Sequence, residues 1–128
     1  MTLVNPTDGF FLLLHTAVIL FNLFGWCWAA TRRANLILLL ATAASWIGLG
    51  AFYGLGYCPL TDWHYQALWE AGVTDLPRSY IAYMCERISG WRPPALATDV
   101  VTAGAFASAL IASITLNIRD YRRRPTPK

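Results

Sequence analysis

Three long apolar stretches dominate the chain, and shorter polar stretches separate them. They cover residues 10–30, 36–57 and 95–118, and their only charged side chain is Asp99. At about 1.5 Å per residue, a helix of this length crosses a hydrocarbon core of about 30 Å. The pattern therefore predicts an all-α membrane protein, a single membrane domain with three transmembrane helices.

The segment between the last two stretches, residues 58–94, is too polar to cross a membrane. Its pattern predicts two short amphipathic helices. The first is capped by Thr61 or Asp62 and stops at Gly72. The second has Pro77 in its first turn and Gly90 after it.

The second short helix carries an apolar stripe. Ile81, Met84, Cys85 and Ile88 follow the i, i+3, i+4, i+7 spacing of one helix face. We expect both short helices to lie on or dip into the membrane interface, where they roof the three spans.

The number and the position of the charged residues both bear on the predicted class of protein. Charged residues make up 13% of the chain, about half of the ~25% usual in soluble domains. The net charge of +3 suggests a nucleic-acid partner, but the basic residues gather beside the spans, which favours the lipid bilayer instead. The predicted anchors to lipid on the cytoplasmic side are Arg32, Arg33, Arg119, Arg122, Arg123 and Arg124.

The distribution of charge predicts the orientation. Three spans place the turn at 31–35 and the tail at 119–128 on one side, where Lys128 joins the six arginines and Asp120 is the only acid. The remaining arginines and acids fall on the other side. The positive-inside rule then puts the N-terminus in the periplasm, the C-terminus in the cytoplasm and segment 58–94 in the periplasm. No cleavable signal peptide is expected, because residues 1–10 lack a basic region.

Small residues recur along the second and third spans. Gly50 and Gly54 form a GxxxG pair, and Gly104, Ser108 and Ala112 recur every fourth residue. Small residues let helices approach closely in lipid, so we interpret these positions as helix-packing faces. A glycine-lined ligand pocket on the second span is the alternative.

Two histidines are the candidates for cofactor binding. His15 shares a face of the first span with Asn22, and His64 follows the end of the second span, so both lie near the outer side. A histidine inside a helix bundle can ligate haem or a chlorophyll-type pigment, and two can share a metal. The alternatives are a structural hydrogen bond and proton or quinone chemistry. No local ligand motif accompanies either histidine.

Cys58 and Cys85 both fall on the predicted oxidising side. They are candidates for a disulfide, and the alternatives are two buried thiols or a catalytic redox pair. The Cys-x-x-Cys spacing of redox enzymes is absent. No pair of carboxylates, phosphate loop or zinc spacing is present, so no catalytic residue is predicted.

Leu14-His15, Cys58-Pro59-Leu60-Thr61 and Ser79-Tyr80-Ile81 resemble the pattern of the DUF2784 family, small bacterial membrane proteins of unknown function. The string Cys58 to His64 resembles a fuller Cys-Pro-Leu-Thr-Asp-Trp-His version found in a subgroup. Many members have a Glu where this chain has His64, and another His at the start of the second span. The resemblance covers residues 10–118 and implies the same topology in a bacterial inner membrane.

The small-residue faces exceed what one three-helix chain needs. We therefore expect a non-catalytic accessory subunit of a larger bacterial membrane complex, of respiratory or photosynthetic type, with other integral membrane subunits as partners. The alternative is a haem- or pigment-binding redox protein that uses His15, either alone or with His64.

Overall fold

The computed structural model describes residues 5–54 and 56–123. Its described part is helical and has no strand. The helices are α1 (Pro6–Phe24), α2 (Arg32–Ala44), α3 (Gly50–Tyr53), α4 (Pro59–Glu70), α5 (Tyr80–Ser89) and α6 (Ala95–Arg122). A 3₁₀ turn, Gly25–Cys27, extends α1, and a π-helical turn, Ser45–Leu49, joins α2 to α3.

Three continuous helical stretches are long and apolar enough to cross a membrane: Pro6–Cys27, Arg32–Tyr53 and Ala95–Arg122. The predicted fold class is confirmed. The first two helices begin four residues before the predicted spans. For α1 the reason is local: Pro6 is its first residue, and the Asn5 side chain caps it by accepting a hydrogen bond from the Asp8 amide at 2.8 Å. Asp8 thus lies inside the helix rather than in a preceding turn.

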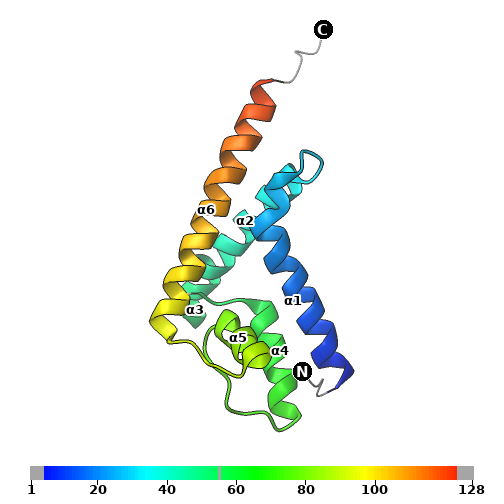
Figure 1. Cartoon of the computed structure of the whole chain (residues 1–128), viewed down its shortest axis with the longest axis vertical. Helices are drawn as coiled ribbons and strands as arrows, with labels where there is room; N and C mark the ends of the chain where they lie inside the picture. Colours follow the sequence, from blue (N-terminus) through cyan, green and yellow to red (C-terminus); the bar gives the residue numbers. More distant parts are fainter. Residues whose placement is uncertain (1–4, 55, 124–128) are drawn as a thin grey trace.

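The two ends of the molecule contain different segments of the chain (Figure 1). The turn between α1 and α2 lies toward the end where α6 finishes, whereas the start of α1 lies near α4 and α5. At the first end, Arg32 forms an ion pair with Asp120 at 3.1 Å, and the Asn117 side chain donates to the Arg32 carbonyl at 3.0 Å. These contacts join the start of α2 to the end of α6.

A buried amide holds α1 against α2. The Asn35 side chain is fully buried and donates to the carbonyls of Phe21 at 2.7 Å and Asn22 at 3.2 Å. The Asn22 amide donates to the Thr42 hydroxyl at 3.0 Å. A Cβ on Gly25 would lie 2.9 Å from the Asn35 amide nitrogen, so this crossing requires glycine. The polar face of the first span, which holds His15 and Asn22, therefore meets protein.

The two short helices exist, but their starts differ from the prediction. Cys58 is the N-cap residue of α4, and neither Thr61 nor Asp62 caps it. Ser79 caps α5 through its side chain, so this helix begins after Pro77. Gly90, with φ of 79°, ends α5 as expected.

The predicted apolar stripe of α5 is not its buried face. The buried residues are Tyr80, Ala82 and Tyr83, whereas Ile88 is 72% exposed. Tyr80 and Tyr83 pack with Tyr65 and Leu68 of α4 into the main buried cluster. Ile81, Met84 and Cys85 of the stripe are half-buried, and Met84 packs against this cluster. The stripe therefore lies at the edge of the buried face, and only Ile88 is exposed.

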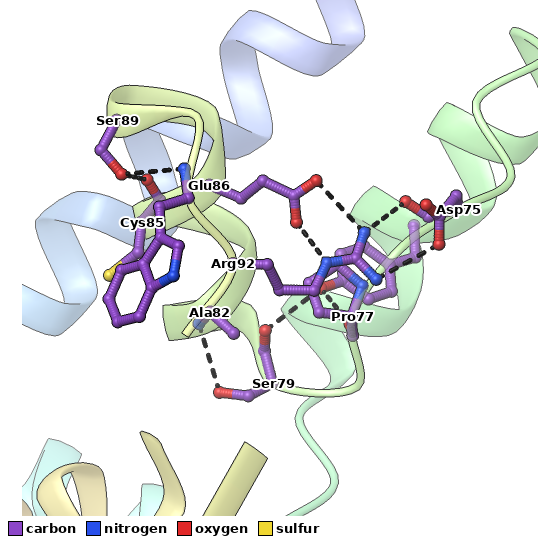
Figure 2. A network of polar contacts seen from close by, with 10 residues as sticks. Asp75, Pro77, Ser79, Ala82, Cys85, Glu86, Ser89 and Arg92 are labelled. Carbon is purple, nitrogen blue, oxygen red and sulfur yellow. Dashed lines mark hydrogen bonds and ion pairs between the residues drawn. The ribbon is translucent and has the colours of Figure 1, made fainter. Parts of the chain in front are cut away.

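Arg92 fastens the α4–α5 connection to α5 (Figure 2). Its guanidinium bonds to the Glu86 carboxylate and donates to the Asp75 carboxylate at 3.2 Å and to the Asp75 carbonyl at 3.1 Å. The Tyr65 hydroxyl donates to the Pro77 carbonyl at 2.7 Å. The hydrogen bond to Glu86 raises the pKa of Arg92 above its usual range. The roof over the spans is thus held by side chains from both short helices.

Candidate functional site

A buried cluster of charged residues joins α1, α4 and α5. Asp8 and His64 are fully buried, and the Arg87 side chain is only 10% exposed. Arg87 donates to the two carboxylate oxygens of Asp8 at 2.6 and 2.7 Å, and His64 Nε2 lies 2.8 Å from Oδ1. The three residues come from positions 8, 64 and 87, so only the tertiary fold assembles them.

Hydrogen bonds hold His64 at both of its ring nitrogens. An ionised carboxylate only accepts hydrogen bonds, so His64 Nε2 donates to Asp8. Nδ1 lies 3.0 Å from the Tyr80 hydroxyl, within hydrogen-bond distance. Burial raises the pKa of Tyr80 above its usual range, which keeps this hydroxyl protonated.

Arg87 keeps its charge in this buried place. Its hydrogen bond to Asp8 raises the pKa of Arg87 above its usual range, against the opposing effect of burial. The guanidinium also donates to the Tyr83 hydroxyl at 2.6 Å. Burial of a charge is tolerated where an opposite charge and hydrogen bonds compensate its lost hydration.

Tyr80 connects this cluster to His15. The His15 ring stacks on the Tyr80 ring with centroids 3.8 Å apart. His15 Nε2 also lies 3.9 Å from Cys58 Sγ. His15 Nδ1 is buried and has no hydrogen-bond partner among the described residues. Such a group costs about 1–3 kcal/mol. The structure therefore brings His15 and His64 together, as the sequence suggested, but with Tyr80 between them.

His64 does not fit the role of a haem or pigment ligand. Both of its ring nitrogens already bond to buried protein groups, Asp8 and the Tyr80 hydroxyl. A ligand at either nitrogen would break a buried hydrogen bond. In the described part of the chain, no three His, Cys, Asp or Glu side chains gather as a metal site.

Cys58 and Cys85 are free thiols in this structure, so the proposed disulfide is not formed there. Cys58 lies against His15 at the start of α4. On α5, the Cys85 carbonyl accepts a hydrogen bond from the Ser89 hydroxyl at 2.6 Å. Both thiols are half-buried.

The predicted helix-packing positions have different environments. Gly50 is buried, but Gly54 lies beyond the end of α3 with φ of 112°, and apart from its chain neighbours no described atom lies within 4 Å of where its Cβ would be. Gly54 therefore ends a helix rather than packing one. Gly104 and Ser108 are exposed on α6, again with open space at Gly104, and Ala112 is half-buried.

The predicted anchoring arginines also divide into two groups. Arg32 turns inward, with its Nε donating to the Trp26 carbonyl at 3.0 Å. Arg119 lies 3.6 Å from Asp120. Arg33, Arg122 and Arg123 are exposed. Arg124 and Lys128 lie outside the described residues.

Sequence reasoning missed Asp8, Tyr80 and Arg87 as members of one cluster. Two signals were present. Asp8 is the only charged residue before the first basic turn, and Arg87 follows Tyr80 by seven residues, on the same face of α5. A charge held next to an apolar span has to find a partner, and Arg87 is the basic residue that the fold supplies.

The comparisons with known proteins identify the family alone. The profile of the family described as "Protein of Unknown function (DUF2784)" matches residues 7–118. No curated protein matches the chain, and no solved structure does. Two strings that carry the resemblance, Leu14-His15 and Cys58-Pro59-Leu60-Thr61, meet in space at the contact between His15 and Cys58. The chain belongs to the DUF2784 family.

Proposed function

We propose that the chain is a non-catalytic accessory subunit of a larger membrane complex, of respiratory or photosynthetic type. The observation that supports this proposal is the outward face of α6. Gly104 and Ser108 are exposed there, and beyond its own helix backbone and chain neighbours no atom of residues 5–54 or 56–123 lies within 4 Å of a Cβ built on Gly104. Small residues on an outward face leave a shallow groove that another helix backbone can fill.

The inward face of the same helix provides the contrast. Ala109 and Ser113 belong to a second row of small residues and are buried, 4% and 0% exposed. That row packs within the chain. The Gly104 row has no such partner in the described part, and lipid tails gain little from a groove of glycine and serine. A helix of another subunit would gain dispersion contacts there.

The test is association in native membranes. A tagged chain is solubilised in mild detergent, and its companions are identified by mass spectrometry and native gel mobility. Gly104→Leu and Ser108→Leu should each release the companions while the chain itself stays folded. Ala51→Leu, at an exposed small residue of α3, is the matched control and should keep them. Retention of every companion in both α6 variants would contradict the proposal.

We further propose that the end with the α1–α2 turn faces the cytoplasm of a bacterial inner membrane. At the opposite end, Arg78, Arg87 and Arg92 each pair with an acidic residue. Arg33, Arg122 and Arg123 are exposed and form no ion pair with a described residue, so they remain available to anionic headgroups. A C-terminal fluorescent-protein fusion should fluoresce, and a C-terminal alkaline phosphatase fusion should be inactive. A dark fluorescent-protein fusion and an active phosphatase fusion would show the opposite orientation and contradict the proposal.

The second candidate is a haem- or pigment-binding protein that uses His15. The observation that favours it is the unpartnered Nδ1 of His15. It predicts a visible absorption band in protein purified from native membranes, and loss of that band in His15→Ala. A colourless preparation would contradict it.

A further inference from the structure

We propose that Cys58 and His15 form a binding site for a soft monovalent metal ion such as Cu(I), with the thiolate sulfur and imidazole Nε2 as the two ligands. The site depends on neither function proposed above. It rests on three features of the described residues: the separation of the two donor atoms, the lack of a competing partner for His15, and access through Cys58.

The separation of the donors suits a shared ion. Cys58 Sγ and His15 Nε2 lie 3.9 Å apart. With the metal–sulfur and metal–nitrogen bond lengths that zinc forms, about 2.3 and 2.0 Å, an ion between them would hold the two atoms roughly 3.5 Å apart at a tetrahedral angle and about 4.3 Å apart when linear. The observed separation falls between these limits, so the ion could enter with little movement of α1 or α4.

His15 has no strong partner to give up. His15 is 6% exposed, and within the described residues its Nε2 makes its polar contact with the Cys58 sulfur. A thiol is a weak donor and acceptor, so the contact with Cys58 satisfies Nε2 poorly. His64 contrasts with it, because Asp8 and Tyr80 occupy both of its nitrogens. Stacking on Tyr80 holds the His15 ring in place.

The donor set selects the kind of ion. Thiolate and imidazole favour soft ions over the hard cations that carboxylates bind. The described residues supply no group of three His, Cys, Asp or Glu donors, whereas structural zinc sites use four ligands. A closed-shell monovalent ion accepts two ligands. Cys58 is half-buried, which gives the ion a route. Binding would transfer the thiol proton to solvent, and the ion would keep its oxidation state.

The test uses the purified full-length chain in detergent, titrated anaerobically with Cu(I) in competition with the chromophoric chelator bathocuproine disulfonate. We expect one tightly held ion per chain. Loss of a second-shell residue weakens metal sites by about 10–100-fold, so Cys58→Ser or His15→Gln should weaken binding by at least about 100-fold. Cys85→Ser removes another half-buried thiol and is the matched control, with unchanged affinity.

A second measurement keeps the test valid if a variant folds poorly. In the wild-type chain, bound Cu(I) should protect Cys58 from alkylation but leave Cys85 as reactive as before, as read by peptide mass spectrometry. X-ray absorption should show one sulfur and one nitrogen ligand. The proposal is overturned if the wild-type chain does not compete with the chelator, if affinity survives Cys58→Ser, or if Cys85 is the protected thiol.

Discussion

Replacing Asp8 with Asn tests whether the buried cluster holds α1, α4 and α5 together. The substitution keeps the size of the side chain and removes its charge. Arg87, with a side chain only 10% exposed, would lose its buried counter-ion. His64 would lose its charged acceptor, 2.8 Å away. The expected result is a large loss of stability without a change in helix content.

The magnitude follows from the contacts. Hydrogen bonds to charged groups contribute about 1.5–3 kcal/mol each, and Asp8 accepts such bonds from Arg87 and His64. The desolvation of both charges on folding offsets part of that sum. Removing one partner of a buried ion pair costs about 3–5 kcal/mol, because the other charge stays buried. We expect a loss in this range for Asp8→Asn.

The assay measures the free energy of unfolding in a defined detergent, with the loss of helix monitored by circular dichroism. Asp99→Asn is the matched control, because Asp99 pairs with Arg78 at 3.5 Å on the surface, where the side chains are 48% and 82% exposed. Exposed pairs contribute about 0–1 kcal/mol. A double variant, Asp8→Asn with Arg87→Met, should recover part of the loss because no charge is then left unpaired. If Asp8→Asn is no more destabilising than Asp99→Asn, the cluster does not hold the helices.

Three further predictions use the same unfolding measurement. Tyr80→Phe removes the hydroxyl that bonds to His64 Nδ1 at 3.0 Å, so it should cost about 1–3 kcal/mol; a neutral result would mean that His64 finds another partner. Gly25→Ala places a Cβ 2.9 Å from the Asn35 amide nitrogen and should cost about 1–3 kcal/mol of stability by overpacking. Gly104→Ala is the control, because its Cβ meets open space among the described residues, and it should be neutral or stabilising. Equal effects of the two substitutions would refute the close approach of α1 to α2. Burial raises the pKa of Tyr65 and Tyr80 above the ordinary value. The unfolded state therefore releases these protons at a lower pH than the folded state, and stability should fall as the pH rises above about 10. Tyr80→Phe should lose less stability than the wild-type chain over that interval, and an equal decline would contradict the role of Tyr80.

Hydropathy alone determined the main architecture. Backbone groups in lipid have to bond within their own helix, so an uncharged stretch of about 20 residues has one stable form. Local chemistry also located the end of α5 at Gly90, since a positive φ there suits glycine. The inward face of the first span was predictable for the same kind of reason, because Asn22 in lipid would leave an amide unsatisfied.

Tertiary structure alone decided the site. Asp8, His64 and Arg87 are 56 and 23 residues apart along the chain, and no local spacing connects them. Taken one at a time in the sequence, Asp8 resembles a helix cap, His64 a lone histidine and Arg87 a surface charge. Docking of α4 and α5 against the start of α1 removes these groups from water, and burial then compels them to pair. The same docking buried Tyr80 and Tyr83 of α5 and left its apolar stripe at the edge of that face, with only Ile88 exposed.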